Sequence, residues 1–114
     1  MSDSHAIRLA EPWQRQLQEG GVRYQRSFHR PSGLTRETVW LVLEDPPAGA
    51  GVILNGQPLA QVASEGGRLE IEITGLLATR NCVEVEVAGD AGPPAGQVIG
   101  PVKLEIRHPP RNRP

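Results

Sequence analysis

Residues 68–87 read RLEIEITGLLATRNCVEVEV, and this stretch decides the fold. Apolar residues occupy every second position of two runs, Leu69, Ile71 and Ile73 and then Val83, Val85 and Val87. Successive side chains of an extended strand point to opposite faces, so this alternation gathers the apolar residues on one face. The stretch therefore predicts two half-buried β-strands joined by the short segment TGLLATR.

The same period of two recurs outward from this stretch in both directions. It predicts further strands at residues 22–28, 39–43 and 102–107, and edge strands at 6–9 and 13–17. Two short apolar runs, 52–54 and 59–62, flank Asn55-Gly56, the pair that best tolerates the positive φ angles of a tight hairpin turn. The pattern places Ile71, Val85 and Leu104 in the core.

The chain favours one all-β domain. No window combines apolar residues at helical spacing with capping residues at both ends. The 13 glycines and 11 prolines cluster between the predicted strands, as is typical of a two-sheet antiparallel sandwich or a barrel. We expect a single domain over residues 1–107, followed by a flexible tail rich in proline and arginine over 108–114.

Composition excludes several classes of partner. The chain has 114 residues with 12 basic and 13 acidic side chains, so a net charge of -1 gives no reason to expect nucleic acid or an anionic membrane. It contains no apolar run of the ~20 residues that cross a bilayer and no secretory signal in its opening segment. We therefore expect a cytoplasmic protein.

The residues that commonly hold metals or cofactors are scattered. His5, His29 and His108 lack ligand spacing, and Cys82 has no second cysteine and is interpreted as a packed or partly exposed thiol. The aspartates are also isolated, at Asp3, Asp45 and Asp90. No metal, no cofactor and no catalytic residue is predicted.

The aromatic residues suggest where a ligand or partner would bind. Trp40 has the opposite parity to Val39 and Leu43, so it should point away from the core, with Val42 on the same face. Such an apolar patch would be covered by another subunit or partner, by the N-terminal segment that contains Trp13, or by a sugar. The candidate ligand or partner surface therefore comprises Trp40, Val42 and Trp13.

Arg26 lies two residues from both Tyr24 and Phe28, so it belongs to the same face of the predicted strand. We interpret it as partly buried against a carboxylate, in a structural role.

Taken in order, the strand motifs resemble the N-terminal sugar-binding domain of family 2 glycoside hydrolases, which include β-galactosidases and β-glucuronidases. The motifs, covering residues 21–107, are VRYQRSFHRP (22–31), ETVWLVLEDPPAGAGVILNGQPL (37–59), LEIEITGLLATRNCVEVEV (69–87) and VIGPVKLEI (98–106). The resemblance implies a galactose-binding-like jelly roll that is itself noncatalytic, because the catalytic glutamates of that family lie in a following barrel.

Four glutamates alternate with the apolar residues, at Glu70, Glu72, Glu84 and Glu86. Paired carboxylates can hydrolyse glycosides, but one of them must be desolvated to act as the acid. A solvated strand face explains the alternation better. If the two strands were neighbours the like charges would repel, so the segment TGLLATR is expected to cross between sheets, as the resemblance also favours.

Two functions follow from this sequence. The first is a noncatalytic carbohydrate-binding or accessory module, which would take a carbohydrate as its partner. The alternative is a protein–protein assembly module with no sugar ligand, which would form a homo-oligomer or bind another protein. An enzyme is not expected, because no nucleophile with a base and no metal constellation can be identified.

Overall fold

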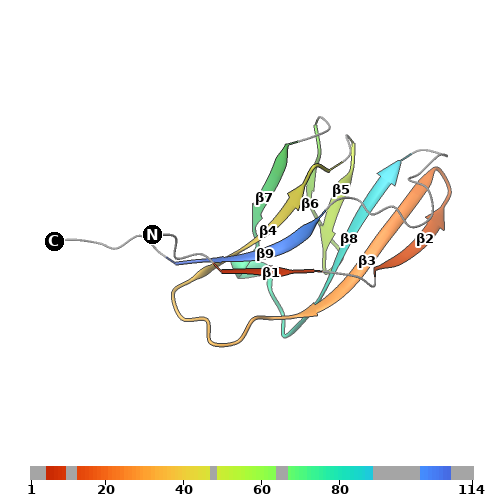
Figure 1. Cartoon of the computed structure of the whole chain (residues 1–114). Helices are drawn as coiled ribbons and strands as arrows, with labels where there is room; N and C mark the ends of the chain where they lie inside the picture. Colours follow the sequence, from red (N-terminus) through yellow and green to blue (C-terminus); the bar gives the residue numbers. More distant parts are fainter. Residues whose placement is uncertain (1–4, 10–12, 47–48, 64–66, 89–100, 109–114) are drawn as a thin grey trace.

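The computed structural model describes residues 5–9, 13–46, 49–63, 67–88 and 101–108. Within these ranges the chain is almost entirely β-strand, which confirms the predicted fold class (Figure 1). The elements are β1 (His5–Arg8), β2 (Gln14–Gln18), β3 (Gly21–His29), β4 (Thr38–Glu44), β5 (Gly51–Leu54), β6 (Gln57–Gln61), β7 (Arg68–Glu72), a 3-10 turn η1 (Thr74–Leu76), β8 (Arg80–Ala88) and β9 (Val102–Arg107).

The strands form two sheets that pack as a sandwich (Figure 1). One sheet has four strands in the order β1-β9-β4-β7, and the other has five in the order β2-β3-β8-β5-β6. The strand pairs that the structure describes are all antiparallel. The predicted edge strands near the N-terminus are confirmed, since β1 borders the four-stranded sheet and β2 the five-stranded sheet.

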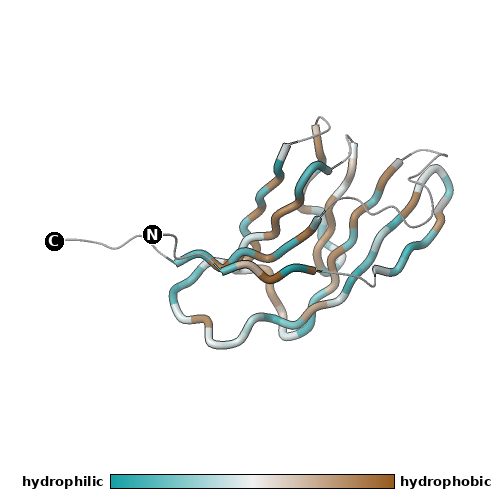
Figure 2. Tube along the Cα trace, viewed as in Figure 1, coloured by the Kyte–Doolittle hydropathy of each residue, from teal (hydrophilic) through white to brown (hydrophobic). Residues whose placement is uncertain are grey.

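The core lies between the inner faces of the two sheets. Hydrophobic and hydrophilic residues alternate along the strands, as Figure 2 shows, and alternate side chains of β3, β4 and β5 are buried in this core. The buried cluster comprises Leu9, Val22, Tyr24, Phe28, Val39, Leu41, Leu43, Ala50, Val52, Leu54, Val62, Ile73, Val83, Val85, Val87, Val102 and Leu104. Val85 and Leu104 are thus buried as predicted. Ile71 is only partly buried, because β7 is an edge strand.

The segment between β7 and β8 crosses from one sheet to the other, as the alternating glutamates predicted. Ile73 is fully buried at the start of this crossing. Asn81, also buried, holds its far end: its Oδ1 accepts the Ala78 backbone N–H at 2.8 Å and its Nδ2 donates to the Ala78 carbonyl at 2.9 Å. Two hydrogen bonds with a buried side chain therefore fix the conformation of the crossing segment.

The β5–β6 hairpin confirms the predicted tight turn. Asn55 and Gly56 have φ angles of 51° and 81°, the left-handed region that this pair tolerates. Asn55 also joins the hairpin to β8, because its Oδ1 accepts the Cys82 backbone N–H at 2.8 Å and its Nδ2 donates to Asn81 at 3.0 Å.

The pairing of β1 with β9 brings the first and last described strands together. The predicted tail lies outside the described residues, apart from His108.

Within the described ranges, no helix is long and apolar enough to cross a bilayer.

Candidate functional site

The four alternating glutamates do not form one cluster. Glu70 and Glu72 project from the outer face of the four-stranded sheet, whereas Glu84 and Glu86 project from the outer face of the five-stranded sheet. The core separates the two pairs, so they cannot act together on one bond. Among the described residues, no three side chains of His, Cys, Asp and Glu come together in a way that could hold a metal ion.

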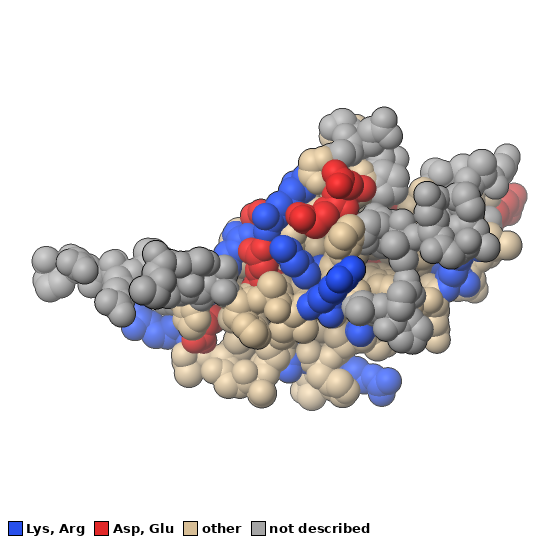
Figure 3. All heavy atoms as spheres, viewed as in Figure 1, with Lys and Arg blue, Asp and Glu red and all other residues tan. Residues whose placement is uncertain are grey.

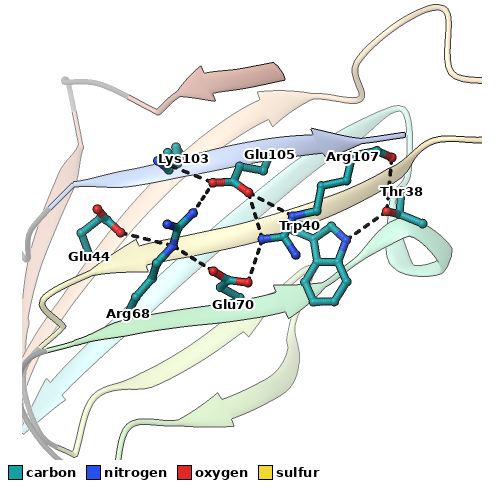
Figure 4. Close-up of polar contacts among 8 residues, drawn as sticks. All are labelled: Thr38, Trp40, Glu44, Arg68, Glu70, Lys103, Glu105 and Arg107. Atoms are coloured by element: carbon teal, nitrogen blue, oxygen red, sulfur yellow. Dashed lines mark hydrogen bonds and ion pairs between the residues drawn. The ribbon is translucent and has the colours of Figure 1, made fainter. Parts of the chain in front are cut away.

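Trp40 lies on the outer face of β4, as its parity predicted, and the protein itself covers part of its ring (Figure 4). The Arg107 guanidinium from β9 lies 4.3 Å from the ring centroid, a cation–π contact. The indole Nε1 donates to Thr38 Oγ1 at 3.0 Å. The ring is therefore fixed in place, with one face occupied by an arginine.

Val42 follows Trp40 on the same face but is not exposed; its relative accessibility is 0%. Its cross-strand neighbours are Glu70 on β7 and Lys103 on β9. The aliphatic stems of such long charged side chains can cover apolar surface while their ends stay in water. The open apolar patch expected from the sequence is thus absent at Val42.

Six charged side chains on this face, Glu44, Arg68, Glu70, Lys103, Glu105 and Arg107, form one continuous ion-pair network (Figure 4). Arg68 pairs with Glu70 at 2.9 Å, with Glu44 at 3.4 Å and with Glu105. Arg107 closes the network by pairing with Glu70 at 2.7 Å and Glu105 at 2.9 Å, and Lys103 approaches Glu105 at 3.6 Å. Figure 3 shows the resulting interleaving of acidic and basic groups over this part of the sheet.

The network shifts the protonation equilibria of its most central members. Burial raises the pKa of Glu105, but the hydrogen bond from Arg107 and the charges of Arg68, Arg107 and Lys103 outweigh it, so the pKa lies below its usual value. The hydrogen bond to Glu70 is the main cause that raises the pKa of Arg107. Both groups are therefore held in their charged forms.

Trp13 does not join Trp40. It precedes β2, packs against the core cluster and donates its Nε1 hydrogen to the Leu9 carbonyl at 3.0 Å. The N-terminal cover considered for Trp40 is wrong for this segment, because β2 pairs with β3 in the other sheet and Leu17 remains 73% exposed. The sequence-predicted surface is therefore divided between two places.

Two further sequence interpretations can be placed. Arg26 is half-buried, and its Nη1 donates to the Ser27 carbonyl at 2.7 Å. Cys82 is partly exposed, as predicted, and its Sγ accepts a hydrogen bond from Gln25 Nε2 at 3.1 Å.

The outer face of the five-stranded sheet is a second candidate surface. The register aligns Gln14, Gln25, Glu84 and Ile53 in one row across β2, β3, β8 and β5. Gln16, Arg23, Glu86 and Gly51 form the next row. Glutamine amides donate and accept hydrogen bonds at once, which suits ligands that carry hydroxyl groups.

Two shallow pockets lie on this face. The β5–β6 pocket, about 390 Å³, is bounded by residues that include Gly51, Ile53, Pro58, Leu59, Gln61 and Glu86. The β2–β3 pocket, about 340 Å³, is bounded by Gln14, Gln25, Arg26 and Ser27. Both volumes lie near the lower end of the range of small-molecule sites.

An arginine with two carboxylates lies on the same face, and one of these carboxylates, Glu86, borders the β5–β6 pocket. Arg23 Nη2 and Nε donate to Glu86 Oε2 at 2.6 and 3.1 Å, and Nη1 lies 3.3 Å from Glu84 Oε2. The hydrogen bond to Glu86 is the main cause that raises the pKa of Arg23. The three groups together carry one net negative charge.

Sequence reasoning missed this second surface. The alternation at Arg23, Gln25, Glu84 and Glu86 was visible, but it indicated only a solvated face. The information that was lacking is strand order, which places β8 between β3 and β5 and so brings the Asn-Gly hairpin beside Glu86.

Comparison with known proteins supports the fold resemblance. No family model matches the sequence, and no curated protein matches it. The structure is similar to a β-glucuronidase of Dictyoglomus thermophilum, with a TM-score of 0.74 and 14% identity over 91% of this chain and 28% of that one. It is also similar to an FMN-binding β-glucuronidase of Facaelibacterium prausnitzii, with a TM-score of 0.73 and 17% identity over 92% of this chain and 23% of that one.

A third similar structure is a putative β-galactosidase from Bacteroides fragilis, with a TM-score of 0.60 and 26% identity over 76% of this chain and 15% of that one. This chain has the fold of a β-sandwich domain found in such glycosidases. It spans about a quarter of the length of the two β-glucuronidases, so their activity does not transfer with the fold.

Proposed function

We propose that this domain is a noncatalytic carbohydrate-binding module that serves as an accessory to a glycosidase. The observation that carries the proposal is the structural match, which covers about nine tenths of this chain but only about a quarter of each β-glucuronidase. A match of this extent corresponds to one domain of a larger enzyme. A separate sandwich of this kind can contribute binding while another part of an enzyme performs the chemistry.

The positions of the carboxylates support a noncatalytic role. Glycosidases place two carboxyl groups on either side of the scissile bond, within about 10 Å of each other. Here the pairs Glu70/Glu72 and Glu84/Glu86 lie on opposite outer faces. Glu70, Glu84 and Glu86 also form ion pairs with arginines.

The assembly alternative has less support from the structure. It relied on an apolar patch at Trp40 and Val42, and Val42 is buried while Arg107 lies over Trp40. Stable protein interfaces are depleted of charged residues at their centre, whereas this face carries an ion-pair network.

A glycan-array screen of the purified domain, combined with its mass in solution, tests the proposal. We expect a monomer that retains at least one class of oligosaccharide, with saturable binding confirmed by calorimetry. A stable dimer that binds no glycan would overturn the proposal in favour of the assembly module. A monomer without any glycan ligand would overturn it as well.

A further inference from the structure

The β5–β6 pocket combines an irregular strand pair with a concave surface. The register of β5 against β6 shifts between Val52 and Ile53, a β-bulge, and Pro58 lies opposite Ile53. Bulges redirect side chains and occur frequently next to binding sites. The pocket therefore lies where the sheet departs from regular pairing.

The lining of the pocket combines apolar and polar residues. Ile53, Pro58 and Leu59 supply apolar surface, and Gln61 and Glu86 supply polar groups. A pyranose ring has the matching character, with one face of C–H groups and an edge of polar substituents. Small-molecule sites commonly have this composition, an apolar lining with a few polar groups that fix orientation.

Arg23 cannot balance the charges of both Glu84 and Glu86. Both donors of the Arg23–Glu86 contact bond to the same oxygen, Oε2, and Arg23 also faces Glu84. Glu86 Oε1 accepts no hydrogen bond from the described residues, and the Glu86 side chain is 38% exposed. The group of Arg23, Glu84 and Glu86 therefore keeps one net negative charge, and Glu86, which borders the pocket, offers its Oε1 to a cationic ligand group while the group as a whole repels an anionic one.

We infer that the β5–β6 pocket binds an amino sugar unit of an oligosaccharide, with the ring against Ile53 and Pro58 and the ammonium group at Glu86. This inference rests on the proposed function and specifies its ligand class. Neutral sugars lack the charge that complements Glu86, and the carboxylate of a uronic acid would be repelled.

Calorimetric titration with a glucosamine tetrasaccharide tests the inference, in parallel with its N-acetylated counterpart, a galacturonate tetrasaccharide and tetralysine. We expect the glucosamine oligomer to bind most tightly and the galacturonate oligomer not to bind. Glu86→Gln should weaken glucosamine binding about tenfold, because a charge-assisted hydrogen bond is lost. Ile53→Thr should also weaken it, whereas the control Glu72→Gln, on the opposite outer face, should bind as the original protein does.

The other outcomes separate the two proposals. If a glycan binds but Glu86→Gln and Ile53→Thr leave its affinity unchanged, the pocket assignment is wrong and the proposed function stands. If tetralysine binds as tightly as the glucosamine oligomer, the surface attracts cations in general and the amino sugar inference fails. If no glycan binds, both proposals fail.

Discussion

At the scale of single residues, Asn81 on β8 connects two separate parts of the structure through its side-chain amide. It is the one polar residue among the buried side chains of the described ranges, and its Oδ1 accepts from both Ala78 N and Asn55 Nδ2. It thereby ties the crossing between the sheets to the β5–β6 hairpin. Buried polar groups are stabilising only when all their partners are present.

Asn81→Ala should therefore be costly. It leaves the Ala78 backbone groups and the Asn55 amide without these partners, so we expect the free energy of unfolding to fall by about 2–3 kcal/mol. Urea denaturation of both proteins measures the difference. A loss below about 0.5 kcal/mol, as at an ordinary surface position, would contradict this role.

Gly56→Val tests the hairpin turn. A Cβ at Gly56 would meet nothing within 4 Å, so the cost comes from the φ angle of 81° alone. We expect a destabilisation of about 1–3 kcal/mol, measured by thermal or urea unfolding. Gly51→Val is the matched control, because Gly51 has equal space and no positive φ. Equal effects of the two substitutions would show that the turn conformation is not the cause.

At the scale of the elements, the outer face of β4 depends on its neighbours β7 and β9. Arg68 and Arg107 come from these two strands and reach the same carboxylates, Glu70 and Glu105. Isolated surface ion pairs contribute little to the free energy of unfolding. This network also holds a tryptophan in place, so one substitution can remove several contacts at once.

Trp40→Ala should lower the melting temperature without changing the mass in solution. The substitution removes the ring that Arg107 covers and the hydrogen bond to Thr38, and we expect a loss of about 1–3 kcal/mol for this half-buried side chain. Differential scanning fluorimetry and light scattering measure the two quantities. Dissociation of an oligomer would instead place Trp40 at an interface, and no change in either would leave ligand contact as its role.

Acid should weaken the four-stranded sheet. Because the pKa of Glu105 in the folded protein lies below its unfolded value, its ionised form stabilises the fold above that unfolded value, which is about 4.3. This contribution is lost as the pH falls through the folded pKa. The free energy of unfolding should decrease as the pH is lowered from about 6 to about 3, and this decrease should be smaller in Glu105→Gln than in the original protein. A decline of the same size in Glu105→Gln would exclude Glu105 as a source.

At the scale of the whole molecule, the sandwich separates its two acidic strand faces. We therefore expect no hydrolysis of nitrophenyl glycosides by the purified domain, because the Glu70/Glu72 pair and the Glu84/Glu86 pair lie on opposite outer faces and cannot act on one bond together. Absorbance of released nitrophenol measures this. Turnover that disappears in Glu70→Gln or Glu72→Gln would contradict the noncatalytic proposal.

The strands and the hairpin could be predicted from the sequence because each depends on a local rule. Alternation at Leu69 to Ile73 and at Val83 to Val87 indicated strands, and Asn55-Gly56 indicated the turn. The Trp40 orientation also followed from parity. Its cover did not, because Arg107 belongs to β9, a strand far along the chain that lies beside β4 only in the folded sheet.

The sequence by itself determined that this is an all-β domain and which strand residues face its core, since periodicity and turn chemistry act between near neighbours. Only the tertiary structure decided which strands lie side by side. That order buries Val42, separates Trp13 from Trp40 and places the β5–β6 hairpin next to Glu86. The physical reason is that strand pairing depends on backbone hydrogen bonds between distant segments, and these bonds leave no pattern in the local sequence.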